Sequence, residues 1–389
     1  PAPVRAVQTA GDVPLVSDPL EPAGDNEGEE FTDEAPSSRV DIAADRLVMD
    51  LGGTDLLTAL VTRDGDSVDR FNEHNVPVRV DSSGSLVKSG GEWLPSLLAW
   101  FEPVGPAPRA RAMGRRLGWS IENGNAGIAV RVGSEPVPVR DVLRRTLEEA
   151  TRPHREQSSE IDETVVVIPA LTNSAARRLV TQMLSELGVD NPVLLTDAEA
   201  VLGSVGLDLA FGEQAVVVQV TLFETRVTLF EGPDQVRGFR CAIDAGLWQG
   251  DETLSREASV ALLREHGIDA DDDEELRSSL RDQVQRLRRQ HVGDGPWSVS
   301  IAGATVEATP ADVARWCSRL SERIALLTHG VMSEHEVNGD DLEALVLITD
   351  EMPWPGLIES FEDLLEVSPI LPDAGPWVRI DGASKKRSN

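Results

Sequence analysis

Apolar and polar positions follow patterns along the first half of this chain that predict strands covered by helices. The runs RLVMDL (46–51) and TALVTRDG (58–65) are strand candidates, and TVVVIPA (164–170) is apolar and rich in β-branched residues, as buried strands are. Apolar residues at helical spacing predict helices over 140–152 and 174–189. The first two runs predict a hairpin, and the strand–helix order that follows favours a parallel or mixed sheet.

The second half repeats this order. QAVVVQV and TRVTLFEG predict a hairpin, QVRGFRCAI a third strand and ALVLIT a buried strand. Helices are expected over 251–267, 273–291 and 310–331, the last with Thr309 as its cap and Pro310 in its first turn. Two short runs in the first half, VPVRV (76–80) and WLPSLLAWF (93–101), also have the length of strands. The duplicated order predicts an α/β fold built from two related halves.

Composition changes the picture mainly at the beginning of the chain. Residues 1–44 are rich in Pro, Gly, Asp and Glu, with little to bury, and predict a disordered acidic tail. The remaining chain has the apolar content of a globular protein, since 40% of all residues are hydrophobic. The net charge of −31 argues against a nucleic-acid partner, because phosphates would be repelled.

Other classes of site and location are also disfavoured. Cys241 and Cys317 are interpreted as buried thiols, with a disulfide between them as the alternative. The histidines show no metal-ligand spacing, and the acidic run 271–273 is interpreted as a helix start and not a Ca²⁺ site. There is no apolar run long enough to span a bilayer, so we expect no membrane insertion by this chain and a cytoplasmic location.

Several segments resemble the ATPase domain of the DnaK-type heat-shock chaperones, from about residue 46 to 384. MDLGGTDLLTALV (49–61) is similar to the family's first phosphate hairpin, and EWLPSLLAW to a strand that follows it. VIPALTNSAARRLVTQMLSELGV (167–189) and LTDAEAVLGSVGL (195–207) resemble two further family segments without a gap. The resemblance implies a two-lobed actin-like, ribonuclease H-like duplicated fold. It places lobe I at 45–208, lobe II at 209–370 and a returning C-terminal segment at 371–389.

The resemblance also implies where ATP and Mg²⁺ would bind. In the first hairpin, Asp50 would orient metal-bound water, while Gly52, Gly53 and Thr54 would approach phosphate. If the chain is active, Asp50 and Thr54 are the expected catalytic residues. A hairpin turn without a ligand is the alternative reading.

The second phosphate hairpin departs from the family pattern. Its three glycines fall on Thr221, Leu222 and Phe223, and its two acids on Gln219 and Arg226. Each added side chain stands where phosphate should lie, and the lost acids remove the metal site. We therefore expect no metal and no cofactor, with Mg-ATP as the alternative.

The remaining nucleotide contacts are altered as well. Thr349 and Asp350 replace the glycines beside adenine, with a purine hydrogen bond to Asp350 as an open alternative. The catalytic lysine has no counterpart, since no lysine lies between Lys88 and Lys385, although Arg115 or Arg116 could neutralise phosphate. Arg286 could take a basic position facing adenosine, or simply face solvent.

These observations predict a pseudo-ATPase that serves as a protein-binding scaffold or regulatory module, without the chaperone family's peptide-binding domain. A slow chaperone-like ATPase and a self-assembling filament protein of the actin type are the two alternatives. A protein partner is expected, and an oligomer is possible. Three tryptophans are candidate partner contacts, with core packing as the alternative for each: Trp248, Trp297 and Trp354.

Overall fold

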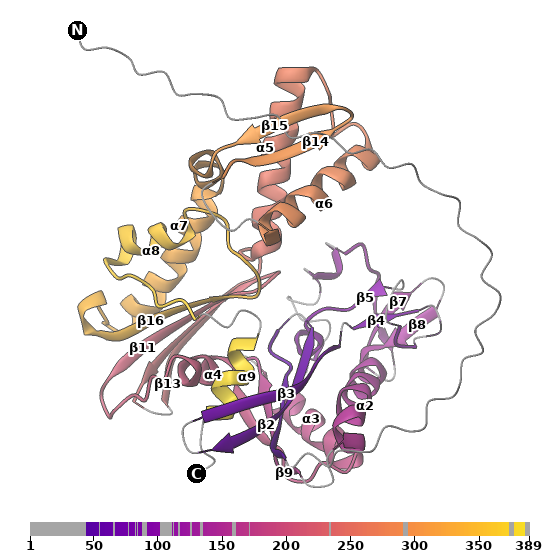
Figure 1. The fold of residues 1–389 in the computed structure, drawn as a ribbon, viewed down its shortest axis with the longest axis vertical. Helices are drawn as coiled ribbons and strands as arrows, with labels where there is room; N and C mark the ends of the chain where they lie inside the picture. Colours follow the sequence, from indigo (N-terminus) through magenta and orange to yellow (C-terminus); the bar gives the residue numbers. More distant parts are fainter. Residues whose placement is uncertain are drawn as a thin grey trace, which may run out of the picture. The chain divides into compact units, whose positions relative to one another are not determined.

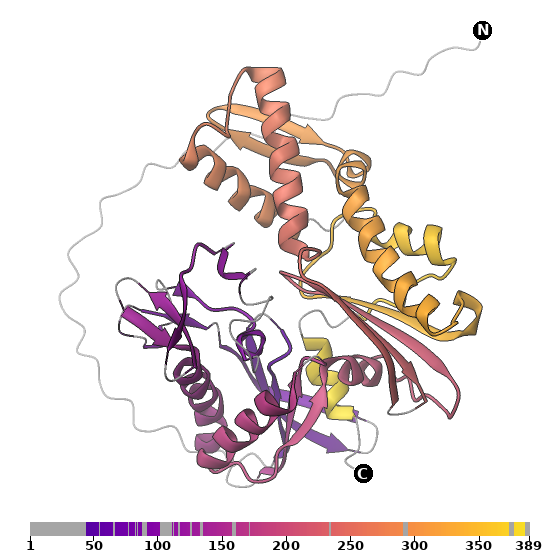
Figure 2. The same cartoon turned by 180° about the vertical axis from the view of Figure 1, so that it is seen from behind.

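A computed structural model describes residues 44–385 apart from short gaps. The gaps are residues 54, 65–66, 77, 82, 84, 88–91, 102–110, 112, 116, 125–126, 133–134, 158–160, 171, 233–234, 291–294 and 373–376. The sequence-based prediction of a disordered tail over 1–44 therefore lies almost wholly outside the described residues. Figure 1 and Figure 2 show the described elements from two sides.

The first half builds a five-stranded mixed sheet in the order β10-β9-β1-β2-β3. β1 and β2 form the predicted antiparallel hairpin, while β9 and β10 run parallel to β1 on its other side. β9 is buried over its last five residues, as its β-branched run predicts. The bounds are β1 Ala44–Asp50, β2 Leu56–Asp64, β3 Ser67–Val76, β9 Ile161–Ile168 and β10 Val193–Thr196.

Helices α2 (Val139–Gln157), α3 (Ser174–Glu186) and α4 (Asp197–Ser204) connect and cover these strands. Asn173 caps α3, because its side-chain oxygen accepts from two backbone amides at 2.9 Å. Thr196 and Glu199 form a reciprocal capping box on α4, which fixes where β10 ends.

The second half builds a four-stranded sheet in the order β13-β12-β11-β16. β11, β12 and β13 are antiparallel neighbours, and β16 runs parallel to β11. Ile370 adds one parallel bridge outside β16, with backbone hydrogen bonds of 2.7 and 3.0 Å to its strand. The bounds are β11 Gln214–Val220, β12 Thr225–Glu231, β13 Gln235–Ala242 and β16 Leu342–Thr349.

Both sheets therefore share one topology. A central strand pairs on one side with an antiparallel hairpin partner and a third strand, and on the other with strands that arrive after helices and run parallel to it. This is the duplication that the hydrophobic pattern predicts, and it confirms the mixed α/β class.

The other elements of the second half are helical except for one hairpin, β14 (Trp297–Ile301) and β15 (Ala304–Ala308). This hairpin lies beside α5 and α6 (Figure 1). The remaining elements are α5 Leu247–His266, α6 Glu274–Gln290, α7 Pro310–Glu334, η2 Gly339–Asp341, α8 Leu357–Leu365 and α9 Val378–Lys385. Although α9 is last in the chain, it packs on α4 and β1 of the first half (Figure 2).

The described part of the first half also contains two small sheets and a short helix. They are the pair β4 Arg79–Val80 and β5 Glu92–Trp93, the sheet β6 Ile121–Gly124, β7 Gly127–Val132 and β8 Glu135–Pro138, and η1 Leu97–Trp100. The expectation of a strand over 93–101 is wrong beyond Trp93. Pro95 has no amide to donate to a neighbouring strand, and Ser96 has φ 51, so the chain turns into a 3-10 helix.

The apolar core is continuous from the first sheet to the second. One buried cluster includes Met49 and Val166 of the first sheet and Val218 and Leu347 of the second. Neither cysteine forms a disulfide in the described part of the chain; Cys317 is buried and Cys241 is half-buried. Among the helices in the described part of the chain, none is both long and apolar enough to cross a bilayer.

Candidate functional site

The turn after β1 holds three of the predicted site residues side by side. Asp50 is fully buried at the end of β1, and its Oδ1 accepts the Gly52 amide at 2.7 Å. Gly53 follows, and Thr54 lies outside the described residues. The Gly52 amide, which the resemblance assigns to phosphate, is thus already bonded within the turn.

Arg379 of α9 reaches this turn from the other end of the chain. Its Nε donates to Asp50 Oδ2 at 2.7 Å, and its Nη1 to Asp350 Oδ1 at 3.3 Å. A Cβ placed on Gly53 would lie 2.5 Å from Nη2 of Arg379, so the guanidinium fills the space beside that glycine. Burial alone would lower the pKa of Arg379, but Asp50 and Asp350 outweigh it and the pKa is raised.

Arg226 of β12 bridges the two sheets near the same turn. Its Nη1 is ion-paired with Asp197 Oδ2, and its Nη2 donates to the Gly52 carbonyl at 2.9 Å. Its Nε lies 3.3 Å from Glu224 Oε1. Where the resemblance implies an acid of the metal site, the chain therefore places a cation that neutralises other acids.

Asp197, the first residue of α4, is fully buried. Its Oδ1 accepts the amides of Ala170 and Ala198 at 3.0 and 2.9 Å, so both carboxylate oxygens have partners. Burial raises the pKa of Asp197, and Arg226 and Arg379 oppose that rise. Both oxygens of this carboxylate thus contact groups of the protein itself.

The turn between β11 and β12 bonds to itself and to α5. The Thr221 amide donates to the Glu224 carbonyl at 2.9 Å, and the Glu224 amide to Thr221 Oγ1 at 3.3 Å. The amides of Leu247 and Trp248 at the start of α5 donate to the Thr221 and Leu222 carbonyls at 2.9 and 2.8 Å. These two amides, which have no partner within α5, therefore donate to the β11–β12 turn.

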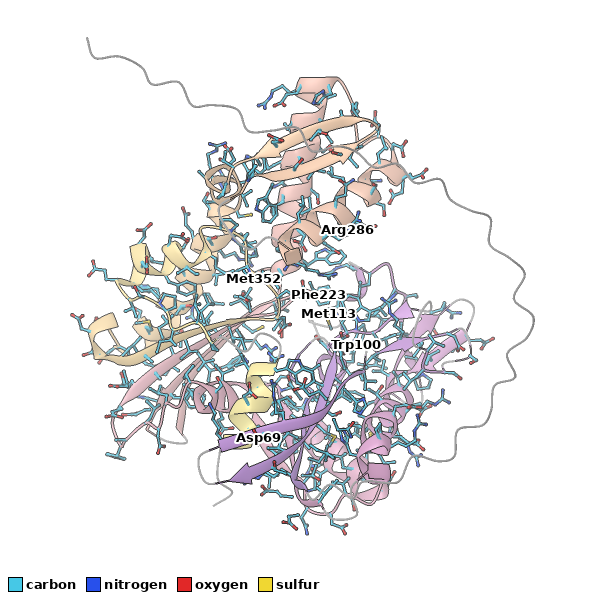
Figure 3. All side chains as sticks on the ribbon, viewed as in Figure 1. Asp69, Trp100, Met113, Phe223, Arg286 and Met352 are labelled. Carbon is cyan, nitrogen blue, oxygen red and sulfur yellow. The ribbon has the colours of Figure 1, made fainter. Side chains whose placement is uncertain are left out.

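Phe223, labelled in Figure 3, is buried at this turn and lies close to two indole rings. Its ring centroid lies 6.3 Å from that of Trp93 and 5.8 Å from that of Trp248. Gln219, where the resemblance implies the other acid, is buried, and its side-chain amide has no hydrogen-bond partner in the described residues. Over the same residues, no group of three or more His, Cys, Asp or Glu side chains is placed to hold a metal ion.

A cavity of about 800 Å³ lies next to these two turns. Gly53 and Arg379 form part of its wall, and three tryptophans contribute apolar surface: Trp93, Trp119 and Trp248. One face of α6 forms another wall through Ser278, Arg281, Asp282, Gln285 and Arg289. The site therefore has a filled part, at the two turns, and an open part between the tryptophans and α6.

Arg286, the predicted adenosine-facing residue, is exposed and does not line this cavity. Its side chain is labelled in Figure 3, and its Nε donates to the Asp282 carbonyl of its own helix at 3.3 Å. The neighbouring Arg281 and Arg289 line the cavity instead. Helical periodicity explains the difference, because residues 281, 285 and 289 repeat every four positions and share one face.

The remaining described residues predicted from the sequence lie outside the cavity wall. Trp297 and Trp354 are buried in the core, and Trp354 Nε1 donates to Ser321 Oγ at 2.8 Å. Asp273 accepts the amides of Glu275 and Leu276 and so caps α6, in agreement with the interpretation of 271–273 as a helix start. Arg115 is exposed, and Arg116 lies outside the described residues.

Sequence reasoning missed Arg379 and Asp197 as members of the site. The signal for Arg379 is a single arginine between two apolar residues of a short helix, since Val378 and Ile380 are both buried. Asp197 carries no such signal, because a helix-start aspartate is usually a solvent-facing cap. Comparison with protein-family models and with curated proteins finds no match to this chain.

Proposed function

We propose that this chain is a pseudo-ATPase with a two-lobed actin-like fold that resembles the DnaK-type ATPase domain and acts as a protein-binding scaffold or regulatory module. The shared topology of the two sheets supports the duplicated fold. The observation that carries the function is the pair of buried arginines, Arg226 and Arg379, at the two turns that would hold phosphates.

The two arginines neutralise buried aspartates, as a metal cation bound with a nucleotide would do. Asp50, which the resemblance assigns to metal-bound water, contacts the guanidinium of Arg379, and the neighbouring Asp197 contacts that of Arg226. Gly52 has both its amide and its carbonyl bonded within the protein. A triphosphate would therefore have to displace buried ion pairs before it could reach the backbone.

The free-energy cost of breaking these ion pairs favours the pseudo-ATPase over a working ATPase. Breaking one buried ion pair by removing a partner costs about 3–5 kcal/mol. Two such pairs cost about 6 kcal/mol or more, and each 1.4 kcal/mol is tenfold in affinity. Nucleotide affinity should thus fall by about four orders of magnitude relative to an open site.

Isothermal titration calorimetry with Mg-ATP tests this function. We expect no saturable heat with ATP or ADP, with or without Mg²⁺, while a DnaK-type ATPase domain titrated in parallel binds. Single-turnover hydrolysis with labelled ATP should stay at the level of buffer. Tight, metal-dependent binding by the wild-type chain would falsify the pseudo-ATPase and favour the slow enzyme.

A further inference from the structure

The open part of the site has aromatic walls that come from distant parts of the chain. Trp93 ends β5, Trp119 precedes β6 and Trp248 lies in the first turn of α5, and all three line the cavity. The buried ring of Phe223 has ring contacts with Trp93 and Trp248. Trp248 Nε1 is buried without a hydrogen-bond partner in the described residues, although a buried indole N–H usually has one.

Two arginines of the cavity wall lack an ion pair within 4 Å in the described part of the chain. They are Arg79 of β4 and Arg281 of α6, and both are partly buried. The Arg281 guanidinium lies 5.7 Å from the Trp248 ring centroid, in a cation–π contact. The other two wall arginines differ, because Arg379 contacts Asp50 and Arg289 contacts Glu351 at 3.0 Å.

The acids of the wall are already satisfied or exposed to water. Asp350 and Glu351 contact arginines. Asp55 accepts from Trp93 Nε1 at 3.3 Å, and burial raises the pKa of Asp55. Asp282 is exposed and needs no partner. Arg79 has an electrostatic contact with Asp55, whereas Arg281 has no acidic partner within 4 Å in the described residues. A partly desolvated arginine without an anion is the unusual case, so Arg281 is the group of the wall that is left unsatisfied.

We infer that this cavity binds a short acidic segment of a partner protein that carries a ring side chain, either proline or an aromatic residue. The ring would pack on the indoles, and the segment's carboxylates would meet Arg79 and Arg281. Ser278, Gln285 and Asn75 on the same walls offer hydrogen bonds to a peptide backbone. The volume lies within the range of sites that bury small ligands, which is enough for a few residues. This inference rests on the proposed function and names the chemistry of its partner.

The test is fluorescence anisotropy of labelled, terminally blocked peptides with the full chain. The first peptide places glutamates on both sides of a Phe-Pro pair, and the second replaces every glutamate by lysine. We expect saturable binding of the glutamate peptide alone. Arg281→Gln should weaken it about tenfold or more, because a charged hydrogen bond is lost.

Arg286→Gln is the matched control, since it removes the same charge from the same helix outside the cavity. It should leave the affinity within about twofold, because a charge on the rim contributes little. The inference is overturned if the lysine peptide binds as well, if the two variants weaken binding equally, or if neither peptide binds. If neither peptide binds and titration with Mg-ATP gives no saturable heat, only this inference is overturned and the proposed function stands. Binding of Mg-ATP removes the proposed function.

Discussion

Single residues decide the charge balance of the interior. Arg226 and Asp197 are 2% and 0% exposed and in direct contact. Each charge is therefore stabilised by the other side chain and not by water. Replacing only one leaves a buried charge, whereas replacing both with neutral residues removes the need for solvation.

Arg226→Met should therefore lower the free energy of unfolding by about 3–5 kcal/mol. Adding Asp197→Asn to that variant should recover part of the loss, because the uncompensated carboxylate is gone. Urea denaturation of the four proteins in a double-mutant cycle measures both effects. Strictly additive losses would show that the two side chains do not interact.

A second residue-scale effect concerns a buried histidine on α2. His154 Nδ1 accepts from Asn72 Nδ2 at 3.2 Å and its Nε2 donates to Thr58 Oγ1 at 2.8 Å, which requires the neutral ring. Asn72 is oriented by His74, whose Nε2 bonds Asn72 Oδ1 at 2.7 Å. Burial, with a contribution from His74, lowers the pKa of His154 from 6.5 to about 4.

Because the folded pKa of His154 lies below the unfolded value, its stabilising effect is complete above pH 6.5 and is lost as the pH falls from 6.5 toward 4. The full shift corresponds to about 3 kcal/mol. Thermal unfolding over this pH range should show a smaller acid-induced loss in His154→Gln than in the wild type. Parallel curves for the two proteins would assign the loss to other groups.

At the scale of elements, the contact between α4 and α9 brings the last helix of the chain to the site. A Cβ at Gly382 would overlap the backbone carbonyl of Ala200, and one at Gly203 would lie 2.7 Å from the Gly382 carbonyl. The two helices therefore touch backbone to backbone, and this close contact positions Arg379 at Asp50.

Gly382→Ala should separate α9 from α4 and move Arg379 away from the turn. We expect a loss of several kcal/mol in unfolding free energy, because overpacking and a broken ion pair add. Gly267→Ala is the control, since a Cβ there meets nothing within 4 Å and only its φ of 69° is unfavourable. Gly267→Ala should lower the unfolding free energy by about 1 kcal/mol in chemical denaturation. Equal losses in the two variants would mean that the close α4–α9 contact contributes no more to stability than an ordinary glycine position.

The elements also show what the sequence can predict. The hairpin of β11 and β12, β16 and α3 were predicted because their apolar runs are long and end in clear turns or caps. β3 was missed because its sequence, SVDRFNEHNV, is mostly polar. β14 and β15 were missed although they alternate buried and exposed residues, so period-2 counting would have found them. The site was predicted only as far as its two turns, because Arg379 arrives through tertiary packing over more than 300 positions.

On the scale of the whole molecule, the charge of −31 is spread over a chain with 67 acidic and 36 basic residues. Such an excess destabilises the compact state by self-repulsion, which salt screens. The melting temperature should thus rise by several degrees between low and moderate sodium chloride. Differential scanning fluorimetry with potassium chloride at equal ionic strength should give the same rise, and sucrose at matched osmolality a smaller one. A melting temperature independent of salt would mean that repulsion is not significant.

The paired arginines and aspartates also constrain how this sequence can diverge. A change at one of Asp50, Asp197, Arg226 or Arg379 leaves a buried charge behind, so drift through single steps passes through poorly folded intermediates. Across descendants of this gene, the members of each pair should be inherited or replaced together, and such covariation would show that selection acts on the pair and not on either residue alone.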